Sequence, residues 1–138
     1  MGTNIRPEIS KKKPYWISRH RYYELKHYCL QYHEWMMLYL SCDGVAAAAI
    51  GLPQTKTYKD PVGSAVSMRE RYLRDIKLVE ESATMTDPVL GRYIFLAVTE
   101  GRSYENLRTT LEIPCCRDVY YELYRKFFWI LSQKKHTL

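Results

Sequence analysis

The side chains best suited to recognise a ligand lie in the last third of the chain. Arg117, Tyr121 and Arg125 follow one another at intervals of four residues, so a helix would present them on roughly one face. An arginine guanidinium can donate two hydrogen bonds to guanine, which is the commonest base-specific contact in the major groove of DNA. The spacing predicts a DNA-reading surface in which Arg117 contacts a base edge.

Other basic side chains would bind phosphates, which position a protein on the duplex without reading its sequence. Arg102 and Arg108 come shortly before Arg117. The remaining candidates lie towards the two ends of the chain and are Lys126, Lys134 and Lys135 together with Lys11, Lys12 and Lys13.

Positive charge is concentrated at both ends of the 138-residue chain, which has a net charge of +6. Seven basic and two acidic side chains give residues 1–28 a charge of +5, and seven basic and four acidic ones give residues 101–138 a charge of +3. The middle of the chain carries −2. This distribution favours double-stranded DNA or another acidic partner.

Residues for catalysis or metal binding do not come together in the sequence. It contains no glycine-rich phosphate loop, His-Glu-x-x-His motif or nucleophile elbow. Cys115 and Cys116 are adjacent and so lack zinc spacing, while Cys29, His27 and His33 offer too few convergent ligands. We therefore expect no enzymatic activity, no metal and no cofactor, with Cys29 in the core and His33 on the surface.

Hydrophobic periodicity predicts that helices position these residues. Residues 1–18 have the composition of a basic irregular arm, and residues 19–138 that of a single helical domain. Apolar side chains three and four positions apart predict helices over 19–41, 61 to about 84, 89–100, 104–111 and about 115–133, with a short helical turn at 45–50 and a loop at 52–59. No segment alternates with the period of a strand, so the fold class is all-α, a bundle of five to six helices.

Capping signals mark the ends of several of these helices. Asp60-Pro61 and Asp87-Pro88 are typical helix starts, and Ser103 is a typical cap. Gly101 is a typical stop.

A short helix, a tight turn and a longer helix predict a C-terminal helix-turn-helix at about 88–133. Leu107, Leu111 and Ile113 would hold the two helices at a steep angle and leave the first turns of the second helix free to enter a major groove. Glu112 stands where the usual turn has a glycine.

The motifs AVTEGRSYENL, IPC and RDVYYELYRKFFWILSQK, with RYYELKHYCLQY near the start, carry a family resemblance. The helix-turn-helix resembles that of sigma-factor region 4. Most of the chain resembles small proteins from prophages of Gram-positive gut bacteria, in the RinA/ArpU class of phage late transcription regulators. The resemblance implies a regulator in the cytoplasm of a bacterial host cell, with Arg117 and Arg125 as DNA contacts. Helix-turn-helix domains usually read half-sites as dimers, so we expect a homo-oligomer.

Two other functions fit the sequence. A packaging protein like the small terminase subunit would share the fold and charge, and a ring-shaped oligomer would favour it, whereas a dimer would favour a regulator. A protein-directed inhibitor of a host nuclease, of the anti-CRISPR type, or of RNA polymerase would instead use the thirteen tyrosines and three tryptophans as anchors. No apolar run approaches the ~20 residues of a membrane-spanning helix, so we expect no membrane partner.

Overall fold

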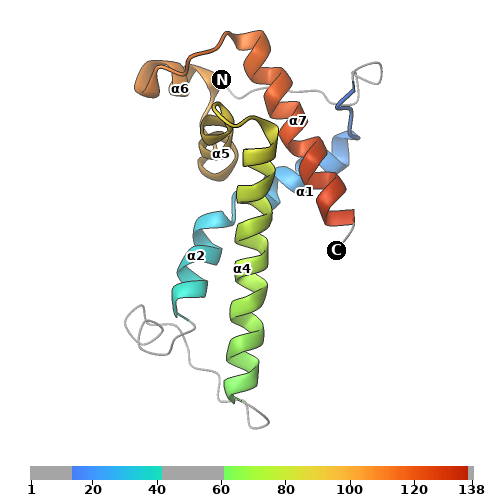
Figure 1. Cartoon of the computed structure of the whole chain (residues 1–138), viewed down its shortest axis with the longest axis vertical. Helices are drawn as coiled ribbons and strands as arrows, with labels where there is room; N and C mark the ends of the chain where they lie inside the picture. The colour runs from blue at the N-terminus through green and yellow to red at the C-terminus, as the bar shows by residue number, and fades with distance from the viewer. Residues whose placement is uncertain (1–13, 42–60, 137–138) are drawn as a thin grey trace. The chain divides into compact units, whose positions relative to one another are not determined.

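The computed structural model describes residues 14–41 and 61–136, with side chains from 68 onward in the second range. In this part of the chain the structure has six helices and no strand, which confirms the all-α bundle (Figure 1). The helices are α1 (Arg19–Cys29), α2 (Tyr32–Ser41), α4 (Pro61–Thr86), α5 (Gly91–Glu100), α6 (Tyr104–Leu111) and α7 (Arg117–His136). The predicted turn at 45–50, the loop at 52–59 and Lys11, Lys12 and Lys13 lie outside the described residues.

The described residues form two compact units. The first joins residues 14–30 to residues 78–136, and the second consists of residues 31–41 and 61–77. The single domain predicted over 19–138 stays a prediction, and each unit is described below by itself.

In the first unit α7 packs against α1 and α5, and α5 packs against α1 and α6. Large side chains from every helix of this unit are completely or almost completely buried between them: Leu25, Val79, Ile94, Leu107, Tyr120, Phe127, Phe128 and Leu131. The helix that carries the predicted reading residues therefore also supplies much of the core.

Tyrosine hydroxyls are buried within this core. The hydroxyls of Tyr22 and Tyr124 lie 3.1 Å apart and share a hydrogen bond. The Tyr120 hydroxyl, in a residue that is 0% exposed, has no hydrogen-bond partner among the described residues. Burial raises the pKa of all three phenols.

The predicted helix over 19–41 is wrong in one respect, because it is broken at Leu30 and Gln31. Leu25 and Cys29 are buried in the first unit, whereas Tyr32 and Trp35 are buried residues of the second. The apolar spacing continues across the break with no glycine or proline to mark it, so periodicity alone predicts one helix.

The corner between α4 and α5 depends on Asp87 and Gly91. The Asp87 carboxylate accepts hydrogen bonds from the backbone N–H groups of Leu90, at 2.7 Å, and Val89, at 2.8 Å, and these bonds lower the pKa of Asp87. Asp87 thus closes a turn, and α5 begins at Gly91, two residues later than predicted. A Cβ at Gly91 would overlap the carbonyl oxygen of Ala83 in α4, so a glycine allows the two helices to approach this closely.

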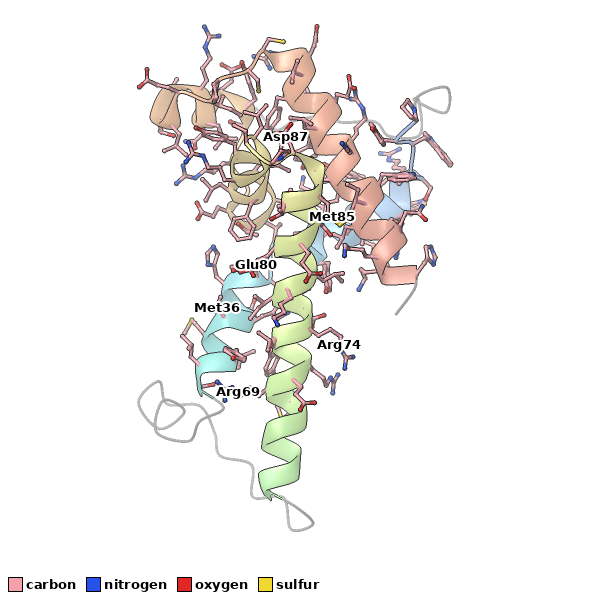
Figure 2. All side chains as sticks on the ribbon, viewed as in Figure 1. Met36, Arg69, Arg74, Glu80, Met85 and Asp87 are labelled. Atoms are coloured by element: carbon pink, nitrogen blue, oxygen red, sulfur yellow. The ribbon has the colours of Figure 1, made fainter. Side chains whose placement is uncertain are left out.

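In the second unit, Arg69 of α4 is joined to Tyr39 of α2. The guanidinium donates a 3.2 Å hydrogen bond to the Tyr39 hydroxyl and lies 4.5 Å from the centre of the ring. Figure 2 shows Met36 on the side of α2 away from α4, and Arg74 on the side of α4 away from α2. Met37 and Leu40 of α2 are exposed, and Met36 is half-buried.

Candidate nucleic-acid interface

Local backbone geometry sets the start and end of α6, as the sequence predicted. The Ser103 hydroxyl caps the helix by accepting a 3.1 Å hydrogen bond from the N–H of Asn106. Just before it, Gly101 ends α5 in the left-handed conformation, with φ of 70°. Glu112 ends α6 in the same conformation, with φ of 50°, which a glycine adopts at lower cost.

The turn between α6 and α7 is held from both sides. The Tyr104 hydroxyl donates a 2.7 Å hydrogen bond to the carbonyl of Cys115, and its ring lies 5.2 Å from that of Tyr120. Leu107 and Ile113 are buried beside them. These contacts connect the first turn of α6 to the turn and to the first turn of α7.

Leu111 does not share the packing role predicted for it. It is 40% exposed, whereas Ile113 is only 6% exposed. The chain changes direction at Glu112, directly after Leu111, and Ile113 is the residue that reaches the core.

The two sides of α7 differ sharply. Tyr120, Tyr124, Phe127 and Leu131 lie on one side and are buried. On the opposite side, positions spaced by four, three and four residues carry side chains that are exposed or half-buried. We call these four residues, Asp118, Glu122, Arg125 and Trp129, the outer strip of α7.

Arg117, the predicted base-reading residue, is the first residue of α7 and bridges to α6. Its guanidinium forms an ion pair with Glu105 and lies 5.2 Å from the centre of the Tyr104 ring. The guanidinium also donates a 3.5 Å hydrogen bond to the hydroxyl of Tyr121. The side chain nevertheless remains 53% exposed, so the structure brings Arg117 and Tyr121 together at the surface.

Arg125 and Lys126 lie beside the N-terminal segment. Arg125 lines a hollow together with Glu122, Pro14 and Tyr15. The Lys126 ammonium lies 5.9 Å from the centre of the Tyr15 ring.

The remaining predicted phosphate contacts are dispersed. Arg102 pairs with Glu100 at 2.8 Å, and Arg108 is exposed at the end of α6. Lys134 pairs with Glu81 at 3.4 Å, and Lys135 lies 3.9 Å from the centre of the Tyr28 ring.

Distance along α7 separates Lys134 and Lys135 from Arg117. At 1.5 Å per residue, Lys134 is roughly 26 Å from Arg117 along the helix. The two lysines therefore belong to a different surface from the first turns of α7.

Two features of this surface were not predicted from the sequence. Glu105 pairs with Arg117 although they are twelve residues apart, and Pro14 and Tyr15 lie against the outer strip. Opposite charges at 105 and 117 were the only sequence signal for the first contact. No spacing rule connects residues 14 and 15 to α7.

The other residues considered for chemistry take ordinary positions. Cys29 is buried, which raises the pKa of its thiol, and His33 is exposed, both as predicted. No group of three metal-ligating side chains occurs among the residues that the structure describes. None of the described helices is both long and apolar enough to cross a membrane.

Comparison with known proteins assigns no family. No family model matches the chain. No curated protein and no solved structure matches it either.

Proposed function

We propose that the chain is a phage-encoded DNA-binding protein whose helix-turn-helix, α6 and α7, places the first turns of α7 in the major groove to regulate late genes. The observation that carries the proposal is the α6–α7 turn. Tyr104, Leu107 and Ile113 hold it from inside, while Arg117, Asp118 and Glu122 stay exposed. A reading helix needs this combination of a buried support and open first turns.

The ion pair between Arg117 and Glu105 is compatible with base reading. An exposed ion pair contributes about 0–1 kcal/mol, whereas a bidentate contact of arginine with guanine gives about 1–3 kcal/mol of discrimination. The release of Glu105 thus costs no more than the discrimination that the guanine contact would supply. In the free protein, Glu105 and Tyr104 hold the guanidinium near the position from which it would read.

The acidic residues of the outer strip suit base contacts better than phosphate contacts. A carboxylate accepts a hydrogen bond from the amino group of cytosine, and phosphate would repel it. We therefore assign Asp118 and Glu122 to the floor of the groove beside Arg117.

The test is fluorescence anisotropy with a pool of duplexes from the DNA around the gene, at two salt concentrations. We expect one duplex to bind tightly and the affinity to fall steeply with salt, because released counterions set that slope. Arg117→Ala should reduce discrimination between the best and a mismatched duplex by about 5- to 150-fold, the equivalent of 1–3 kcal/mol.

Glu105→Gln is the matched control, because it removes the ion pair and keeps Arg117. If Arg117 reads a base, Glu105→Gln should retain the sequence preference. Equal loss in both variants would show that Arg117 only positions α7, and would overturn its assignment as a reading residue.

The oligomeric state of the complex, together with these binding measurements, separates the alternative functions. A dimer on the bound duplex supports a regulator, and a ring-shaped oligomer supports a packaging protein. Absence of binding at both salt concentrations would overturn DNA binding and favour an inhibitor directed at a host protein, for which the exposed Met85 and Val89 of the first unit offer apolar contacts.

A further inference from the structure

The first unit contains a small cavity where α1 and α5 end. Lys26 and Leu30 line it from the end of α1, Ala97 and Val98 from α5, and Arg102 from the turn to α6. Its volume is about 90 Å³. Because a water molecule needs about 10–15 Å³ of such space, the cavity has room for about six to nine water-sized groups. It therefore suits a ligand of a few non-hydrogen atoms.

Two cationic side chains line this cavity, and none of its lining residues is acidic among those that the structure describes. Lys26 is half-buried, and within the described part of the chain no carboxylate pairs with its ammonium. Arg102, whose side chain is 32% exposed, pairs with Glu100 through Nε, which uses only one of the N–H donors that a guanidinium offers. A partly buried cation that lacks a carboxylate is stabilised when another anion binds beside it. The two side chains therefore provide donors for an anionic group.

Much of the remaining wall is apolar. Ala97 and Val98 are buried, and Leu30 is exposed. Aliphatic groups of a ligand would leave water on binding against these side chains, which is favourable. Two basic side chains and the nearby Glu100 give this region a charge of +1. One carboxylate neutralises that charge, whereas a phosphate dianion exceeds it.

We propose that this cavity binds a short aliphatic monocarboxylate. The carboxylate contacts Lys26 and Arg102, and the carbon chain lies against Leu30, Ala97 and Val98. This inference goes beyond the proposed function and does not depend on DNA binding by α7. Butyrate, a four-carbon carboxylate, is the probe of matching size.

The first experiment titrates the full-length chain with acetate, propionate, butyrate, hexanoate and inorganic phosphate and follows backbone amide resonances by NMR. Gly101 and Ser103 line the cavity, so their amides report binding there. We expect the affinity to rise about four-fold with each methylene group from acetate to butyrate, and to fall for hexanoate, which is too long for the cavity. Tighter binding of phosphate than of butyrate, or an affinity that does not depend on chain length, would overturn the proposal.

The second experiment repeats the butyrate and hexanoate titrations with variants. Lys26→Gln and Arg102→Gln should each weaken butyrate binding about ten-fold or more, because each removes hydrogen bonds to a charged group. Arg19→Gln is the matched control and should bind butyrate unchanged, because Arg19 is an exposed residue of the same helix as Lys26 and does not line the cavity. Leu30→Ala enlarges the cavity and should move the preference from butyrate towards hexanoate, which a purely electrostatic attraction would not do.

These results separate a ligand site from a purely structural role of the two cations. Lys26 and Arg102 lie at the carbonyl ends of α1 and α5, where a cation is favourable without any ligand. If butyrate binds the Lys26→Gln and Arg102→Gln variants as tightly as it binds the control, the cations only stabilise these helix ends and the inference is overturned. Failure of butyrate to shift the Gly101 and Ser103 resonances of the unmodified chain would overturn it as well.

Discussion

Tyr120 and Tyr124 lie one helical turn apart on the buried side of α7, and the same substitution should change stability in opposite directions at the two positions. The Tyr120 hydroxyl is buried without a partner among the described residues, and such a group costs about 1–3 kcal/mol in lost hydration. Tyr120→Phe removes the hydroxyl and keeps the ring. We expect it to raise the free energy of unfolding by about 1 kcal/mol.

Tyr124→Phe should have the reverse effect. It removes one partner of the 3.1 Å bond to Tyr22 and leaves the Tyr22 hydroxyl, in a residue that is 2% exposed, without a partner in the core. The expected loss is about 1–2 kcal/mol. The two variants should therefore differ by about 2–3 kcal/mol, although each loses one oxygen atom from the same helix.

Urea unfolding followed by circular dichroism measures the difference directly. The denaturation midpoints should move in opposite directions while the slope of the free energy against urea stays constant, since neither change alters the surface that unfolding exposes. Destabilisation of the same size in both variants would refute the reasoning, because it would show that the Tyr120 hydroxyl is as well satisfied as that of Tyr124.

Three further predictions concern pH and the backbone. The three phenols with raised pKa values stay protonated in the folded state above the ordinary tyrosine value of 10.0. The stability that these phenols contribute is therefore fully present below pH 10 and should fall above it by up to about 4 kcal/mol per pH unit, measured by urea unfolding at several pH values. Glu112→Gly should raise stability by about 1 kcal/mol in the same assay, because a non-glycine residue at φ of 50° is strained. Gly91→Ala should lower the melting temperature strongly, because the added Cβ overlaps the backbone carbonyl of Ala83, and overpacking costs about 1–3 kcal/mol.

Each of these has a result that contradicts it. Stability unchanged between pH 10 and 12 would mean that the phenols ionise equally in the folded and unfolded chains. A Glu112→Gly variant no more stable than the parent would mean that the glutamate side chain offsets the strain. Unchanged melting of Gly91→Ala would show that α4 and α5 do not approach as closely as the structure has them.

Local signals predicted much of the fold around the candidate interface. Ser103 and Gly101 act through hydrogen bonds and backbone angles within a few residues, so their roles as cap and stop could be deduced from the sequence. Asp87 was recognised as a start signal. The position at which α5 begins, however, depends on the close approach of Gly91 to Ala83, eight residues away. Such contacts depend on tertiary packing and correspond to no periodic pattern in the sequence.

The site was predicted less completely for the same reason. The faces of α7 follow from helical spacing, which placed Arg117 and Tyr121 together. The partner of Arg117 on α6 and the contact of Tyr15 with Trp129 both join residues distant in the chain. Periodicity also predicted α1 and α2 as one helix. It shows which positions are apolar, but it does not show in which of the two units each side chain is buried.

The two-sided character of α7 has a consequence for how this protein can diverge. Substitution on the buried side would disturb several packed rings at once, whereas exposed positions away from special contacts usually tolerate change within about 0.5 kcal/mol. Asp118 and Glu122 are exposed and belong to no part of the core. If the first turns of α7 read DNA as proposed, related chains could acquire new target preferences at these two positions while they inherit the scaffold unchanged. Recognition and folding would then evolve separately on a single helix.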